Sequence, residues 1–129
     1  MLPQGASSAL HLSEITELLW PRFIELNGCV IRDRPQVRDS FDEWWQRHGD
    51  EPWRIESVMN HVHLYDLVGD DDSHSELPLL ERAAQRIRSS WQVALAHGFP
   101  DRSFEITYAT EPDEYGPTVS FYQPAPGKQ

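Results

Sequence analysis

The chain has 129 residues, of which 39% are hydrophobic and 11% aromatic, and its 21 acidic and 11 basic residues give a net charge of −10. This length predicts one domain with a single core, and the aromatic content argues against disorder. The charge excludes an ordinary nucleic-acid binder, which neutralises phosphates with Lys and Arg. It also disfavours a peripheral protein that binds an anionic membrane surface.

Cys29 is the only cysteine, which excludes an internal disulfide framework and a cysteine-rich zinc site. No apolar run reaches the roughly 18 residues of a membrane helix, and residues 1–13 lack the basic and apolar parts of a secretory signal. We therefore expect a soluble, cytoplasmic protein with a flexible arm at 1–12, a globular domain at 13–123 and a disordered tail at 124–129.

A helix is predicted near the N-terminus. Ser13 is a good N-cap, and Glu14 and Glu17 suit the positive end of a helix dipole. The apolar residues that follow recur at helical spacing and form one stripe: Ile15, Leu18, Leu19, Phe23 and Leu26. Pro21 is expected to bend or split this helix.

Asn27-Gly28 comes next and has two interpretations. It is either the C-terminal cap of the helix or the two-residue turn of a hairpin between Arg22–Leu26 and Cys29–Arg32. The unbroken helical stripe favours the cap, which leaves 29–31 as a short strand.

Two more helices are predicted in the middle of the chain. The first begins between Asp33 and Pro35, ends at Gly49, and buries a stripe of Val37, Phe41, Trp44, Trp45 and His48. The second begins near Pro52, with a stripe of Ile55, Val58, Met59 and Val62. Past Asn60 the apolar residues also alternate as in a strand, and we favour the helix.

The second half of the chain predicts an acidic loop at 69–75, then a long helix, then a hairpin. The helix ends before Gly98 and Pro100, and its apolar stripe consists of Leu80, Ala83, Ala84, Ile87, Trp91, Ala94 and Leu95. The hairpin pairs 103–110 with 118–122. Alternation turns these residues toward the core: Phe104, Ile106, Tyr108, Val119 and Phe121.

This order of elements predicts an α+β domain. Three or four helices are expected to pack on one face of a small antiparallel sheet that includes a C-terminal β-hairpin. Neither an internal repeat nor a linker divides the chain.

Two histidines in segment 60–66 are the best candidate for a binding site. If the segment is a strand, His61 and His63 lie on one side, where two imidazole nitrogens suit zinc. The candidates for a further ligand are Asp66, His74 and His11. No cofactor is expected, and zinc is the one metal that this pattern admits.

The same segment has two other interpretations. As a helix, it separates the two histidines by about 200°, and His63 pairs with Asp66 three residues on. The alternative without a ligand is that Asn60 and the histidines bond backbone groups at a helix end. Four residues of the segment are therefore kept as candidate binding residues: Asn60, His61, His63 and Asp66.

Trp45 and Trp53 are candidate anchors for a partner. Neighbours on a helix are about 100° apart, so Trp45 lies at the edge of a stripe centred on Trp44. Tryptophan is enriched at the energetic centres of protein interfaces. The alternative is that the rings simply cover the sheet.

The acidic residues gather in one part of the chain. Between Asp42 and Glu76, ten acidic residues against two arginines give a net charge of −8. A surface of one sign speeds association with an oppositely charged partner. The densest part of this segment consists of Asp70, Asp71 and Asp72. These residues lack the spacing of an EF-hand calcium loop, and we include them in the candidate binding surface. The alternative is a solvated face that promotes solubility.

Catalytic residues are not assigned. Cys29 lies in an apolar run, where an inert buried thiol is expected. None of the common nucleophile, phosphate-loop or metalloprotease motifs is present.

The leading hypothesis is a small non-enzymatic protein-binding domain whose acidic middle segment engages a basic protein. In size, acidity and aromatic content the chain resembles the small bacterial immunity and antitoxin proteins that neutralise basic nuclease toxins, although no motif carries this resemblance. One alternative is a metal-binding protein or metal-dependent enzyme that uses His61, His63 and Asp66. Another is a structural or housekeeping domain that forms a homodimer through its Trp-rich face.

Overall fold

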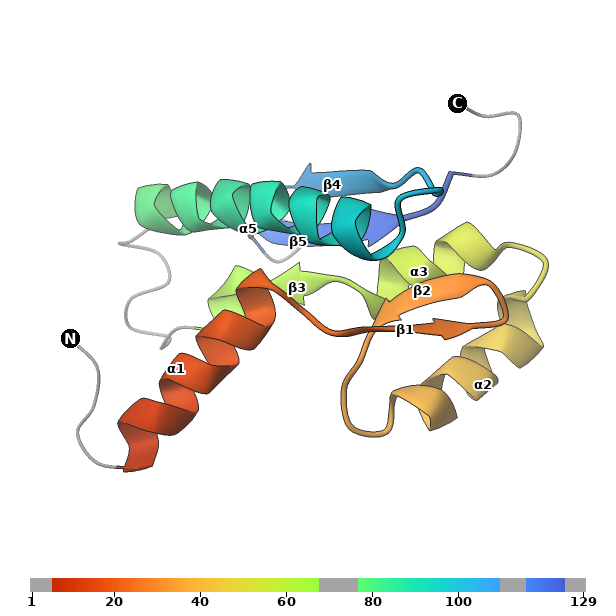
Figure 1. The fold of residues 1–129 in the computed structure, drawn as a ribbon, viewed down its shortest axis with the longest axis horizontal. Helices are drawn as coiled ribbons and strands as arrows, with labels where there is room; N and C mark the ends of the chain where they lie inside the picture. Colours follow the sequence, from red (N-terminus) through yellow and green to blue (C-terminus); the bar gives the residue numbers. More distant parts are fainter. Residues whose placement is uncertain (1–5, 68–76, 110–115, 125–129) are drawn as a thin grey trace.

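The computed structural model of the chain describes residues 6–67, 77–109 and 116–124, and Figure 1 shows the arrangement of its elements. Within these ranges the elements follow one another as α1 (Ala6–Leu19), β1 (Phe23–Leu26), β2 (Cys29–Arg32), α2 (Val37–His48), α3 (Pro52–Met59), β3 (Val62–His63), the 3-10 helix η1 (Leu64–Leu67), α5 (Leu77–Gly98), β4 (Glu105–Ala109) and β5 (Thr118–Tyr122).

The strands form two antiparallel sheets. β1 and β2 pair as a hairpin, and the second sheet has the order β3-β5-β4. In Figure 1, α5 lies along β4 and β5, while α2, α3 and the β1–β2 hairpin occupy the opposite end of the molecule from α1. In the register of the C-terminal pair, Ile106 lies opposite Phe121 and Tyr108 opposite Val119, as alternation predicts.

The α+β class, the antiparallel sheets and the C-terminal strand pair are confirmed. Val119 and Phe121 of β5 pack in the same core as Trp91 of α5. Ser120 points to the other face of β5, where its hydroxyl donates to the carbonyl oxygen of Ser57 in α3 at 2.6 Å. Helices therefore lie on both faces of β5, whereas the sequence predicted them on one.

Two apolar cores meet at β2. Successive side chains of a strand point to opposite faces, so Val30 joins the core around Trp91, while Cys29 and Ile31 join a second core around Phe41. The first core combines aliphatic side chains with edge-to-face aromatic contacts; the rings of Trp91 and Phe121 are 5.6 Å apart at 81°. β2 is thus buried on both sides.

The N-terminal segment differs from the prediction. α1 already begins at Ala6, within the expected arm, and ends at Leu19 rather than continuing to residue 26. Pro21 stops it, because a proline inside a helix removes a hydrogen bond and its ring clashes with the preceding turn. Asn27 and Gly28 have φ of 50° and 86°, the two positive values of a tight hairpin turn. The helix cap favoured from the sequence is therefore wrong, and the hairpin alternative is correct.

The middle and long helices agree with the prediction. α2 ends at His48, and α5 spans the predicted stripe and ends at Gly98. α3 stops at Met59, however, and residues 62–63 form β3, with Val62 opposite Val119. The helical continuation past Asn60 is therefore wrong; the alternation reflected a strand paired to the hairpin. The acidic loop at 69–75 and most of the C-terminal tail lie outside the described residues.

Glu56 of α3 joins the two sheets from a fully buried position, with only 1% of its surface exposed. Its Oε2 accepts from the backbone N–H of Val30 at 2.8 Å and from Nε2 of Gln123 at 2.6 Å. Its Oε1 accepts from the backbone N–H of Gln123 at 2.8 Å. Burial raises the pKa of this carboxyl above the usual glutamate value, and the three hydrogen bonds oppose part of that rise.

Asn60, one turn further along, makes the same connection with its amide. Its Oδ1 accepts from the backbone N–H of Arg32 at 3.0 Å. Its Nδ2 donates to the carbonyl oxygens of Val30 at 3.0 Å and of Phe121 at 3.3 Å. Because Asn60 is completely buried and three of its four hydrogen-bonding positions are used, it is committed to the fold. We call Glu56, Asn60 and their partners the α3 junction.

Candidate functional site

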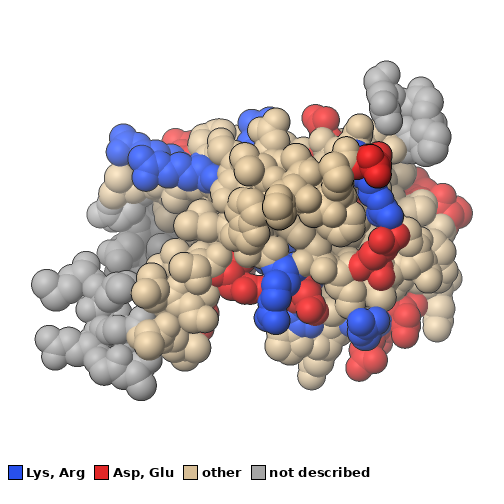
Figure 2. Space-filling view, viewed as in Figure 1, with Lys and Arg blue, Asp and Glu red and all other residues tan. Residues whose placement is uncertain are grey.

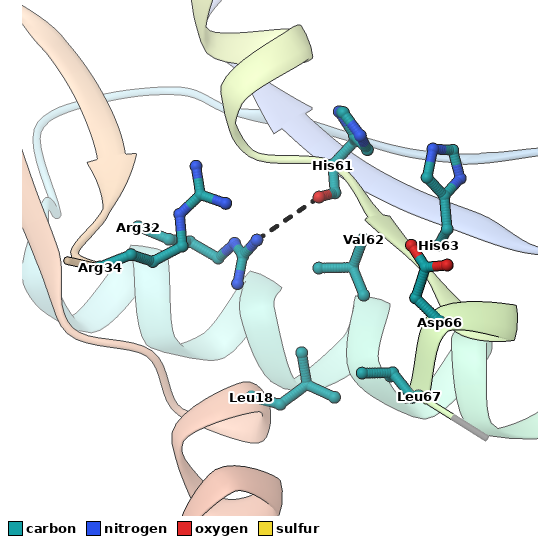
Figure 3. A pocket seen from close by; sticks show the side chains of 8 residues that line it. All are labelled: Leu18, Arg32, Arg34, His61, Val62, His63, Asp66 and Leu67. Carbon is teal, nitrogen blue, oxygen red and sulfur yellow. Dashed lines mark hydrogen bonds between the residues drawn. The ribbon is translucent and has the colours of Figure 1, made fainter. Parts of the chain in front are cut away.

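An open hollow of about 300 Å³ lies beyond the C-terminal end of α3, where α1, β2, β3 and η1 meet (Figure 3). The residues that line it are Leu18, Arg32, Arg34, His61, Val62, His63, Asp66 and Leu67. In Figure 3 the two arginines stand on one side of the hollow and Asp66 and Leu67 on the other, with Leu18 below. The site therefore has a cationic side, an apolar part and one carboxylate.

His61 and His63 lie on one side of the chain, as the strand interpretation predicts. Their ring centroids are 4.6 Å apart at an interplanar angle of 55°. In Figure 3 both rings point the same way, and Val62 between them points the opposite way; Val62 belongs to the core around Trp91. The helix interpretation, in which the rings diverge, is wrong because β5 holds this segment extended.

Each of the two rings is oriented through its Nδ1 atom. The Nδ1 of His61 contacts the carbonyl oxygen of Val58; a carbonyl only accepts, so this nitrogen carries the proton. The Nδ1 of His63 lies 2.8 Å from Oγ1 of Thr118, whose hydroxyl donates to the carbonyl oxygen of Gly116 at 3.0 Å. Because its proton is used in this way, Oγ1 of Thr118 accepts a hydrogen bond from Nδ1 of His63. The hydrogen bonds therefore place the ring lone pair of each histidine on Nε2.

A third metal ligand is not found in the part of the chain that the structure describes. Across 6–67, 77–109 and 116–124, no group of three His, Cys, Asp or Glu side chains is arranged to hold a metal ion. Asp66 lines the same hollow but does not complete such a group with His61 and His63. His11 is exposed on α1, and His74 lies outside the described residues.

Arg32 and Arg34 form the cationic side of the hollow. Nη2 of Arg34 donates to the carbonyl oxygen of Met59 at 2.8 Å, and Nη2 of Arg32 donates to that of His61 at 3.4 Å. Both acceptors belong to the chain at the end of α3, where the helix dipole is negative. Each guanidinium is thus held in place by one carbonyl group.

The surroundings of Arg32 are unfavourable for its charge. Burial lowers its pKa to about 10, and the positive charge of Arg34 acts in the same direction. Its Nε is buried and has no hydrogen-bond partner among the described residues. The guanidinium does lie over the ring of Trp91, 5.5 Å from its centroid, which favours the cation by roughly 0.5–2 kcal/mol.

The tryptophans proposed as anchors lie apart from this hollow. Trp45 is half-buried and stacks on Phe41 with ring centroids 5.6 Å apart. Trp53 is also half-buried and contacts Tyr122 at 6.1 Å. Both rings therefore contribute to packing and keep part of their surface exposed.

The described acidic side chains of the middle segment differ in burial and in pairing, although the segment as a whole is strongly acidic in composition. Glu56 is buried in the α3 junction, and Glu51 pairs with Arg54 at 3.4 Å. Asp42 and Glu43 are exposed on α2. Figure 2 shows acidic and basic side chains close together on the face in view rather than a single acidic surface. Asp70, Asp71 and Asp72 lie outside the described residues.

The sequence analysis did not identify Arg32 and Arg34 as site residues. Their signal was available: two arginines separated by one residue, at the end of a buried apolar strand, point to the same side. Because the chain is acidic, these two arginines entered the sequence analysis only as part of its net charge. The structure places them beside the histidine pair.

The fold and the hollow define a small α+β domain in which a helix joins two antiparallel sheets through buried polar side chains. No family model, curated protein or solved structure matches the chain. Across the described ranges, no helix combines the length and the apolar character needed to cross a membrane.

Proposed function

We propose that this chain is a cytoplasmic, non-enzymatic protein-binding domain that engages a basic protein through the outer face of α2. The observation that carries the proposal is a set of three exposed carboxylates within one turn: Asp39, Asp42 and Glu43. None of the three forms an ion pair within the described residues; the ion pairs there involve Glu17, Glu51 and Glu25. Like charges at helical spacing destabilise a helix by about 0.2–0.5 kcal/mol per pair, and a basic partner relieves this repulsion.

The neighbouring aromatic surface supports the same proposal. Trp45 lies three residues after Asp42, on an adjacent part of the helix surface, and is only half-buried. Tryptophan is enriched among the residues that contribute most of the binding energy of protein interfaces, and charged groups are typical of the rim around them. Asp42 and Trp45 both belong to the middle segment that the sequence analysis identified.

A variant of α2 in which uncharged amides replace the three carboxylates tests this proposal. We expect immobilised wild-type protein to retain a basic protein from the source-cell lysate in about 0.05 M salt and to release it in about 0.5 M salt, because exposed charges are screened. The variant Asp39→Asn/Asp42→Asn/Glu43→Gln should lose this protein.

A matched control changes the same number of charges elsewhere. Glu14→Gln/Asp101→Asn/Glu105→Gln alters three exposed acids outside α2 and should retain the partner. If both variants lose it equally, only net charge matters and the α2 surface is not the binding site. If no protein is retained, or if binding is indifferent to salt, the proposal is wrong.

Metal binding is the second candidate function, and the histidine pair favours it. Two rings 4.6 Å apart, each with its Nδ1 proton directed at an oxygen, resemble metal-ligating histidines that donate their other N–H to a second group. Zinc, copper and nickel suit such ligands. Metal analysis of tag-free protein, followed by zinc titration of wild type and His61→Ala, tests it. Absence of binding below about 1 mM, or equal binding by the variant, excludes this function.

A further inference from the structure

We propose that the Arg32–Arg34 side of the hollow binds the carboxylate of a small organic acid whose apolar part lies against Leu18, Val62 and Leu67. This proposal does not depend on the proposed protein partner, although Arg34 also lines a neighbouring hollow with Asp39 of α2. Its volume of about 300 Å³ is at the lower end of the range for small-molecule sites, roughly 300–1,000 Å³.

The two guanidinium groups are held in position and form no ion pair within the described part of the chain. Arg32 is the last residue of β2 and Arg34 follows two residues later, so both point into the same region. In Figure 3 they stand together on one side of the hollow, opposite Asp66. Neither forms an ion pair with any carboxylate in the described residues, although acidic residues outnumber basic ones 21 to 11 in the chain.

The hydrogen bonds of the two arginines leave donors unused. A guanidinium has five N–H groups, and within the described ranges Arg32 and Arg34 each donate one bond to the protein, to the carbonyl oxygens of His61 and Met59. The Nε of Arg32 is buried without an acceptor. A bound anion would supply acceptors to the unused Nη groups and offset the repulsion between the two positive charges.

The rest of the hollow determines which anion fits. A carboxylate matches the planar fork of a guanidinium with two parallel hydrogen bonds. Leu18, Val62 and Leu67 contribute apolar surface, which favours an aliphatic or aromatic group on the acid. Asp66 on the opposite side repels a second negative charge, so a monocarboxylate fits better than a phosphorylated or multiply charged ligand.

Titration of the full-length chain with hexanoate, followed by NMR, tests the proposal. We expect saturable shifts of the Nε–Hε signal of Arg32 and of the amide signals of residues that line the hollow. Hexan-1-ol, which lacks the carboxylate, should produce no saturable shift, and acetate and inorganic phosphate should bind more weakly than hexanoate.

Variants of the exposed arginine separate binding from folding. Arg34→Gln should weaken hexanoate binding by about tenfold or more, because a charge-assisted bidentate contact is lost, and Arg34→Lys should restore part of it. Arg86→Gln, at an exposed position on α5, removes the same charge elsewhere and should leave binding unchanged.

Three results would overturn the proposal. The first is a set of shifts that grow linearly with hexanoate and match those caused by hexan-1-ol or by salt. The second is unchanged affinity in Arg34→Gln while the amide spectrum shows an intact fold. The third is phosphate binding as tight as that of hexanoate, which would identify an unspecific anion site instead of a site for an apolar carboxylate.

Discussion

Two sets of polar side chains lie beside α3, and they differ in how far the fold satisfies them. In the α3 junction, both oxygens of the buried Glu56 carboxylate and the amide of Asn60 bond to backbone or side-chain groups of two sheets. In the hollow at the end of the helix, the buried Nε of Arg32 has no hydrogen-bond partner among residues 6–67, 77–109 and 116–124. The first set stabilises the architecture, and the second leaves donors for a ligand. Both sets contain buried polar groups, but only the first has its hydrogen-bonding capacity largely used by the fold.

Glu56→Ala should give the largest effect. It removes the acceptor of three N–H bonds, two of them from backbone groups at Val30 and Gln123, and leaves buried donors unsatisfied. We expect the free energy of unfolding to fall by about 3 kcal/mol, measured by urea denaturation. The exposed Glu43→Ala serves as a control and should change it by less than about 0.5 kcal/mol. A loss below about 1 kcal/mol for Glu56→Ala would show that the junction contributes little.

Cys29 gives an independent measure of the same junction. Burial raises the pKa of its thiol to about 12, and the charge of Glu56 contributes in the same direction, so the folded protein should react very slowly with an uncharged alkylating reagent at pH 8. Glu56→Ala should accelerate labelling by about a hundredfold, since opening becomes less costly. Mass spectrometry follows the reaction. Equal labelling rates in the two proteins would contradict a role of Glu56 in closing this region.

The pH dependence of stability should report the buried charge of Glu56. Because burial raises its pKa in the folded state, the folded protein holds this proton at a higher pH than the unfolded chain, whose glutamate titrates near roughly 4.3. The resulting stabilisation is complete below the unfolded pKa and is lost as the pH rises through the folded pKa. Urea unfolding of wild type and Glu56→Gln from pH 4 to 8 measures the difference. Parallel profiles would mean that Glu56 does not titrate differently in the two states.

Arg32→Met should give the smallest change in stability. It removes one long hydrogen bond and a cation–π contact with Trp91 but also a buried, partly unsatisfied charge, and replacing such a charge by an apolar side chain is often neutral. We expect an unfolding free energy within about 1 kcal/mol of wild type. A decrease of the unfolding free energy by more than about 2 kcal/mol would show that Arg32 stabilises the fold as the α3 junction does. It would then weaken the contrast between the two sites.

The helices with a strong period were predictable from the sequence. The stripes of α2 and α5 bury large side chains such as Phe41 and Trp91, so local pattern and tertiary packing agree. At Phe23 and Leu26 they do not: these residues match a helical stripe by spacing, yet they sit on a strand and pack into two different cores. Pro21 and the Asn27-Gly28 pair were the more decisive signals, because both act on backbone geometry directly.

The candidate site was only partly predictable for a related reason. The proximity of His61 and His63 follows from strand geometry, which is local. The partners of Asn60 lie as far away as Phe121, and the pairing of Glu56 with Gln123 spans a similar stretch of chain, so no pattern in a short window identifies them. The spacing of Arg32 and Arg34 is a local signal, but their position beside the histidine pair follows only from the packing of α3 against β2.

The α3 junction also covers one edge of strand β2. β1 covers one edge of β2, while on the other edge the N–H groups of Val30 and Arg32 and the carbonyl of Val30 bond to the side chains of Glu56 and Asn60. An uncovered strand edge is a template for pairing with another chain. Two side chains of a helix thus take the place of a neighbouring strand, and the same residues that hold the sheets together block this edge of β2 from pairing with another chain.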